Sequence, residues 1–296
     1  FRSGTDIHTA TAAQVFGVEP EQVFCGNGSD EVLAFAFRAF CGAGQPVAFA
    51  DVTYGFYKSQ AALFDLDVKI IPLREDFTLH VDDYMDFPGT IVIANPNAPT
   101  GIAMPTSEIE RILQHNPESL VVVDEAYVDF GGESVLPLLD RYENLMVVQT
   151  FSKSRAMAGM RIGFAIGHPT LIRALHDVKY SFNSYTLNRT SLSAGVASVK
   201  DRPYLEQQTA KIIATREHAK QVLAELGFQF PDSKSNFLFV THPDCDAHEL
   251  FLALREAHIF VRWFDSPRIR NYLRISIGTE EQMEALYQFL RQYLKK

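Results

Sequence analysis

Short apolar runs alternate with amphipathic helical patterns through about the first two hundred residues. The runs are as short as strands usually are, and they cover residues 22–25, 46–50, 68–71, 90–94, 120–124, 145–150 and 161–166. Val, Ile and Leu follow one another with few polar breaks, which indicates strands that are covered on both faces. Because helical patterns separate most of the runs, the chain is predicted to be an α/β protein with a mainly parallel, seven-stranded sheet.

The hydrophobic pattern changes near residue 203. A long helical pattern covers residues 203–226, and apolar runs at 236–241 and 272–277 follow it, with a helical pattern from Ala247 between them. We therefore predict a large domain, residues 1–202, and a smaller C-terminal α+β domain, residues 203–296, with the helix 203–226 linking them. The final helical pattern should bury one apolar stripe, formed by Met283, Leu286, Tyr287, Leu290 and Leu294.

Composition narrows the class of protein. The 296 residues are 47% apolar and 21% charged, as in an ordinary globular protein, and the net charge of −9 argues against a broad nucleic-acid or anionic-membrane surface. Three widely spaced cysteines, Cys25, Cys41 and Cys245, suggest neither a disulfide framework nor a zinc site, which favours the cytoplasm. No apolar run approaches the length of a membrane span. Phe1 is not an initiator methionine, and we expect an upstream segment before it.

Unusual residues follow the first two apolar runs. In open α/β sheets ligands bind beyond the carboxyl ends of the strands. The run 22–25 is followed by GNGSDEV, where Ser29 and Asp30 open a helix whose free N–H groups suit a phosphate. An ordinary glycine turn with a Ser29 N-cap explains this segment as well. Tyr54, after the run 46–50, could stack on a flat ligand or simply pack in the core.

The next two runs bring an asparagine and an aspartate to the sheet edge. The run 90–94 leads into NPNAPTG, a rigid turn that could present the amide of Asn97 to an oxygen, although turn chemistry alone explains it equally. The run 120–124 ends at Asp124, and Tyr127 lies three residues on. A buried aspartate needs a cationic or hydrogen-bonding partner. A helix-capping aspartate is the alternative reading.

The most informative segment is TFSKSRAMAGMRIG, in which Lys153 follows a strand and lies between Ser152 and Arg161. A lysine amine that attacks an aldehyde must be neutral. We expect partial burial and the nearby Arg161 to favour that form, with an exposed loop lysine as the alternative. Together the five segments offer phosphate donors, an arginine, an acid, a phenol, an amide and an amine, which is the set that a phosphorylated pyridine aldehyde needs.

With these motifs and YLRISIGT, the chain resembles the fold-type I aminotransferases, and more narrowly the histidinol-phosphate aminotransferases, over nearly its whole length. The resemblance implies pyridoxal 5'-phosphate (PLP) as cofactor, with Lys153 as its covalent anchor and proton carrier. It also implies that Asp124 pairs with the pyridinium nitrogen and Tyr127 bonds the ring oxygen. By the same resemblance Tyr54 stacks on the ring, and the phosphate is bound by Ser29, Asp30 through its backbone, Ser152 and Arg161.

The resemblance also implies a substrate and an assembly. Arg274 in YLRISIGT matches the family's arginine for the substrate anion, and Arg262 is a second anion contact or a solvated edge-strand arginine. The expected reaction moves an amino group between L-histidinol phosphate and 2-oxoglutarate, giving imidazole acetol phosphate and L-glutamate in L-histidine biosynthesis. The family forms homodimers, so a cytoplasmic homodimer is expected.

One departure and several alternatives remain. Many relatives have an asparagine where this chain has Ala98, which leaves Asn97 as the expected partner of the ring oxygen. Aromatic or broad-range aminotransferases and threonine-phosphate decarboxylases are the nearest alternatives in function. A ligand-sensing domain of a DNA-binding regulator would need a basic helix-turn-helix extension, which this acidic chain does not show. His242, Cys245 and His248 match no tight zinc pattern, so no metal is expected.

Overall fold

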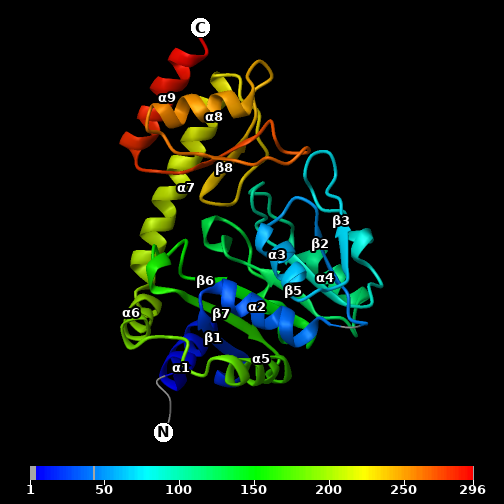
Figure 1. Ribbon diagram of the computed structural model, residues 1–296. Coiled ribbons are helices and arrows are strands. Elements are labelled where there is room, and N and C mark those ends of the chain that lie inside the picture. The colour runs from blue at the N-terminus through cyan, green and yellow to red at the C-terminus, as the bar shows by residue number, and fades with distance from the viewer. Residues whose placement is uncertain (1–4, 43, 296) are drawn as a thin grey trace.

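A seven-stranded sheet forms the lower part of the molecule (Figure 1). The computed structural model describes residues 5–42 and 44–295, with the side chains of residues 5–8 left out. In the order of their positions across the sheet, the strands are β1 (Val23–Asn27), β7 (Ile162–Gly167), β6 (Leu145–Thr150), β5 (Val121–Asp124), β4 (Thr90–Ala94), β2 (Val47–Ala50) and β3 (Val68–Ile71).

The sheet is mainly parallel, as predicted. β2 pairs in parallel with β3 and β4, and β4, β5 and β6 continue the parallel pairing. β7 is antiparallel to both of its neighbours, β1 and β6. The connection from Thr150 to Ile162 is too short for the helical crossover that a parallel neighbour requires. The carboxyl ends of β1, β2, β4, β5 and β6 and the amino end of β7 therefore lie along one edge.

Helices cover both faces of this sheet, which explains the continuous apolar runs. Alternate residues of β5 show the division, because Val121 and Val123 belong to one apolar cluster and Val122 to the other. The first cluster includes residues of α1 (Thr5–Phe16), α4 (Thr106–His115) and α6 (Arg189–Lys200). The second includes residues of α2 (Ser29–Phe40), α3 (Gly55–Leu63) and α5 (Pro169–Phe182).

A second sheet and its own apolar core form the upper part of the molecule (Figure 1). The sheet is antiparallel, in the order β8 (Phe237–Val240), β10 (Leu273–Ser276) and β9 (Arg262–Trp263). α8 (Ala247–Glu256) and α9 (Glu280–Tyr293) pack on it. Of the predicted apolar stripe, the four residues within α9 are buried in the core, and Leu294, just past the end of the helix, is partly buried. α7 (Arg202–Glu225) runs between the two parts and differs from its predicted range by one residue at each end.

Two arginines join the upper and lower parts. Arg216 of α7 is buried, and its Nη1 donates to the carbonyl oxygens of Phe130, 2.7 Å away, and Ser235, 2.9 Å away. Arg268 forms an ion pair with Asp51, which directly follows β2. These contacts hold the loops after β2 and β5 against the upper part. The division into domains 1–202 and 203–296 stays a prediction.

Candidate active site

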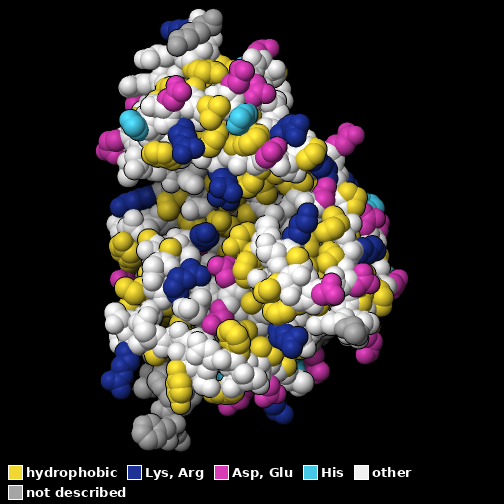
Figure 2. Space-filling view, viewed as in Figure 1, with side chains coloured by type: hydrophobic (Ala, Val, Ile, Leu, Met, Phe, Trp, Pro, Cys, Tyr) yellow, Lys and Arg dark blue, Asp and Glu magenta, His cyan; other side chains and the backbone are white. Residues whose placement is uncertain are grey.

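Side chains from six strand ends line one pocket at this edge of the sheet. Figure 2 shows a hollow across this face of the molecule, with Lys and Arg side chains along it. All the predicted site residues except Asn97, Arg262 and Arg274 line the pocket. Its lining residues are Ser29, Asp30, Tyr54, Ala94, Pro96, Ala98, Asp124, Ala126, Tyr127, Thr150, Ser152, Lys153, Ala158 and Arg161.

The turn that leads into α2, whose first residues Ser29 and Asp30 line the pocket, leaves room only for glycine at positions 28 and 163. α2 begins at Ser29 after Gly28, whose φ of +85° lies in the left-handed region that favours glycine. A Cβ on Gly28 would overlap the guanidinium of Arg161, and a Cβ on Gly163 of β7 would overlap the backbone of Gly28 and Ser29. The free N–H groups that begin α2 therefore lie close to an arginine, as in an anion site.

The carboxylate of Asp30 ties two other pocket residues together. Its Oδ2 lies 3.2 Å from Nη2 of Arg161, and its Oδ1 accepts a hydrogen bond of 3.0 Å from the hydroxyl of Tyr54. Arg161 also donates to the hydroxyl oxygen of Ser152, at 3.5 Å. The sequence reading assigned only the backbone of Asp30 a role, whereas its side chain positions both the arginine and the aromatic ring.

Asp124 is the buried acid of the pocket. It ends β5, and its carboxylate accepts hydrogen bonds from the Tyr57 hydroxyl at Oδ2, 2.7 Å, and from the Ala126 amide at Oδ1, 3.1 Å. Burial raises the pKa of Asp124 to about 6, against the lowering effect of these two hydrogen bonds. A cation placed in the pocket would favour the ionised form.

Lys153 follows β6 and lines the pocket. Its Nζ lies 5.4 Å from the centre of the Tyr127 ring, and this ring packs edge-on against Phe237 at 5.0 Å. Lys153 is exposed, so the expectation of partial burial is wrong. The side chain leaves the sheet edge and opens into the pocket, where solvent reaches it.

Asn97 is not brought into the pocket. Its amide nitrogen donates to the Val52 carbonyl and to the Thr100 hydroxyl, both at 3.0 Å, and its amide oxygen accepts from the Thr53 hydroxyl at 2.8 Å. Those contacts use the amide to fix the loops after β2 and β4. The residues of this loop that line the pocket are Pro96 and Ala98, so the geometry does not support Asn97 as the partner of a ring oxygen.

The two predicted substrate arginines lie opposite each other in the upper sheet. Arg274 of β10 pairs in register with Arg262 of β9, and both guanidinium carbons lie over the Phe264 ring, at 5.8 and 5.5 Å. Arg274 also lies 5.0 Å from the centre of Phe237, the ring that packs on Tyr127. In the described part of the chain neither arginine has a carboxylate partner, and the buried Nε of Arg274 has no hydrogen-bond partner.

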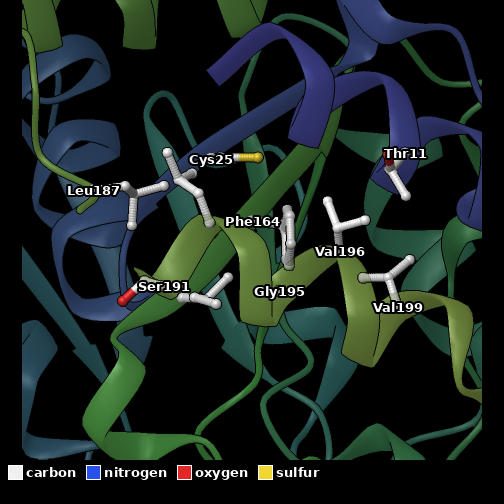
Figure 3. Close-up of a pocket in the computed structure, with 10 residues that line it drawn as sticks. Thr11, Cys25, Phe164, Leu187, Ser191, Gly195, Val196 and Val199 are labelled. Atoms are coloured by element: carbon white, nitrogen blue, oxygen red, sulfur yellow. The ribbon is translucent and has the colours of Figure 1, made fainter. Parts of the chain in front are cut away.

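A second, smaller cavity lies between α1, α6 and the large sheet (Figure 3). Its described lining is apolar apart from Thr11, Ser191 and the thiol of Cys25, and it carries no charge. Burial raises the pKa of Cys25 to about 12, which keeps the thiol protonated and unreactive. The cavity offers packing space and no chemistry.

No metal cluster emerges from the described residues. Among them, no group of three or more His, Cys, Asp or Glu side chains is arranged to hold an ion. His242 interacts with the Leu226 carbonyl, and His248 packs on the Trp263 ring at 4.2 Å.

Every described helix is too short or too polar to span a bilayer.

Residues 5–290 match the family described as aminotransferase class I and II. The chain belongs to the class I and II aminotransferases. The fold predicted from the sequence, a fold-type I α/β transferase, is thereby confirmed.

This aminotransferase has close curated relatives. The histidinol-phosphate aminotransferase of Brachyspira hyodysenteriae is 46% identical over 284 residues, which is 96% of this chain and 80% of that protein. The histidinol-phosphate aminotransferase of Lactococcus lactis subsp. cremoris is 51% identical over 275 residues, 93% of this chain and 77% of that protein. A solved histidinol-phosphate aminotransferase from Sinorhizobium meliloti, in complex with pyridoxal-5'-phosphate, has a TM-score of 0.88 at 24% identity and covers 99% of this chain and 82% of that one. At that identity the likeness shows the fold alone.

Two residues of this aminotransferase's site were missed in the sequence. Tyr57, which bonds Asp124, lies on the buried side of α3 and reads as an ordinary core aromatic. Gly163 reads as a strand glycine, although a glycine inside an apolar strand can signal the close approach of another backbone. Both residues are visible in the sequence, in the segments TYGFY and RIG, but the sequence does not indicate which distant residues each of them contacts.

Proposed function

We propose that this aminotransferase is a PLP-dependent histidinol-phosphate aminotransferase, which moves an amino group reversibly between L-histidinol phosphate and 2-oxoglutarate. The products are imidazole acetol phosphate and L-glutamate, and the reaction is a step of L-histidine biosynthesis. The observation that carries the proposal is the set of curated relatives with that name, at 46% and 51% identity over more than nine-tenths of the chain.

The residues of the pocket suit PLP in charge and in shape. The glycine turn at Gly28, the amides that begin α2 and Arg161 would bind the phosphate. Asp124 would pair with the pyridine nitrogen, and Tyr54 would pack on the ring face. When bound, the protonated ring accepts the electron pair left by removal of the substrate's α-proton. With Ala98 in the loop after β4, Tyr127 is the remaining side chain proposed to bond the ring oxygen.

Lys153 would perform the proton transfers of the reaction. Its amine is proposed to anchor the cofactor and, when released, to take the proton from the α-carbon of the amino donor. The open position of Lys153 in the pocket, over Tyr127, leaves room for this movement. One residue thus serves as anchor and as base.

Arg262 and Arg274 support a substrate that carries a phosphate. Like charges directly opposite on neighbouring strands repel each other, so a pair without carboxylate partners is stabilised when an anion lies between them. Ring contacts run from Arg274 through Phe237 to Tyr127, which lines the Lys153 pocket, and they support this role. We propose that the arginines bind the phosphate of histidinol phosphate and, in the other half-reaction, a carboxylate of glutamate.

We also propose that the chain works as a cytoplasmic homodimer. Phe182 and Tyr185 are 80% and 83% exposed and lie close together in the sequence at the end of α5, and large exposed aromatics commonly mark contact surfaces. Free cysteines at all three positions are compatible with a reducing compartment. Sedimentation analysis of the purified protein tests the assembly, and a monomer at micromolar concentration would exclude it.

Absorption spectroscopy with defined amino donors tests the function. Purified protein with PLP should show a bound-cofactor band that changes on addition of histidinol phosphate and returns with 2-oxoglutarate, with equimolar glutamate formed. A spectrum that responds only to aromatic amino acids would indicate a broader aminotransferase. Release of carbon dioxide from phosphothreonine would indicate a decarboxylase. Absence of any bound-cofactor band would refute the cofactor assignment.

A further inference from the structure

Tyr57 and Asp124 form a buried pair beneath the pocket. The Tyr57 side chain is fully buried, Asp124 is 4% exposed, and the hydroxyl of Tyr57 donates to Oδ2 of Asp124 at 2.7 Å. The Ala126 amide bonds the other carboxylate oxygen. Each carboxylate oxygen therefore has one partner from the protein and keeps a lone pair for a partner in the pocket.

The Tyr57 ring is held so that its hydroxyl stays on Asp124. Phe37 stacks on it at 6.3 Å, Phe49 packs at 5.9 Å, and Tyr54 meets it edge-on at 5.7 Å. Burial and the charge of Asp124 raise the pKa of Tyr57 well above 10, so the hydroxyl keeps its proton throughout the working range of pH. The Tyr57 hydroxyl therefore stays in place and stays protonated, so it donates to Asp124 at every working pH.

We infer that Tyr57 is a positioning residue for cofactor binding, because its hydroxyl fixes the Asp124 carboxylate at the pocket wall and stabilises its ionised form. This inference rests on the proposed function, since a protonated pyridine nitrogen requires an ionised partner. Tyr57 itself does not line the pocket, so it acts through Asp124.

Several other groups act on Asp124 from the elements around it. Asp30 of α2 opposes its ionisation, Lys153 after β6 favours it, and the phenols of Tyr54 and Tyr127 lie in the same pocket. Burial works against the charged form, and the hydrogen bond from Tyr57 is the largest effect that favours it. Losing that bond should therefore move the balance toward the neutral acid.

Tyr57→Phe tests the inference, because it removes one hydroxyl and keeps the ring. Tyr84→Phe is the matched control: Tyr84 is equally buried, and its hydroxyl has no hydrogen-bond partner among the described residues. In cofactor-free protein with carbon-13 in its aspartate carboxyls, the Asp124 signal is identified from its loss in Asp124→Asn. Its titration midpoint should rise by about one to two pH units in Tyr57→Phe, as expected for a charge-assisted bond, and stay unchanged in Tyr84→Phe.

The second measurement is PLP binding. Tyr57→Phe should bind PLP about tenfold or more weakly, and with saturating PLP it should lower kcat and leave KM for the amino donor unchanged. In an Asp124→Asn background the same change should have little further effect. An unshifted Asp124 midpoint in Tyr57→Phe, or equal effects of both phenylalanine variants, would overturn the inference. Failure of the wild-type protein to bind PLP would refute the proposed function, while the titration still decides whether Tyr57 controls Asp124.

Discussion

The substitution Gly163→Ala should weaken phosphate binding at the turn before α2 and leave the other side chains of the site in place. Gly163 lies in β7, opposite Gly26, and the new methyl group would overlap the Gly28 and Ser29 backbone, with the Gly28 carbonyl oxygen only 2.8 Å away. Close C···O contacts are about 3.3–3.6 Å. The turn must therefore move by roughly 0.5 Å or more, because β7 is paired on both sides and has little freedom to shift.

The displacement has a cost in stability and a cost in binding. Overpacking of this kind destabilises proteins by about 1–3 kcal/mol. If the moved Ser29 amide loses one charge-assisted hydrogen bond to the cofactor phosphate, PLP affinity should fall about 10- to 150-fold. Gly167→Ala, in the same strand, is the control because its Cβ would meet nothing closer than the Leu145 carbonyl, at 3.1 Å.

Two titrations measure these effects. Urea unfolding gives the stability of each variant, and equilibrium titration with PLP, at a temperature where all variants are folded, gives the affinity. Competition between inorganic phosphate and PLP gives the affinity of the turn for phosphate alone. If Gly163→Ala binds PLP within about threefold of the wild-type affinity, the turn is not part of the phosphate site.

Three further predictions address other parts of the site. Lys153→Ala should fold normally and lose the absorbance of bound cofactor after gel filtration; a band that survives would exclude Lys153 as the anchor. Arg274→Ala should raise KM for histidinol phosphate about tenfold or more with little change in PLP affinity, and an unchanged KM would remove it from the site. Burial raises the pKa of Glu125 to about 7, so its stabilising contribution is complete below about pH 4 and is lost as the pH rises through 7. Relative to wild type, Glu125→Gln should therefore gain stability between pH 5 and pH 8 in urea unfolding; parallel pH curves would contradict this assignment.

Much of the fold could be read from local patterns. The apolar runs at 90–94 and 145–150 coincide with β4 and β6, because apolar residues in series suit strands that are buried on both faces. The run at 68–71 also coincides with its strand, β3, but this is an edge strand in which only Ile71 is buried. The stripe of α9 was readable because its spacing is helical. The direction of β7 was not assigned beforehand, although the short connection that precedes it carries that information.

The site could be predicted to the extent that it follows from strand ends. Ser29, Asp124 and Lys153 come from distant parts of the chain, and they line one pocket because parallel strands end along the same edge. Asn97 shows the limit of this reasoning. Its position after β4 is as predicted, but the direction of its side chain depends on Val52, Thr53 and Thr100, which bond it away from the pocket.

The sequence by itself determined the strands and helices, the residues available at each strand end and the membership of the aminotransferase family, because these depend on local pattern and on motifs. Tertiary structure alone decided which groups meet across the molecule: Tyr57 on Asp124, Gly163 against Gly28, and Arg262 opposite Arg274. Such contacts depend on packing and register over long sequence separations. The charge state and the orientation of the site residues are therefore properties of the folded chain.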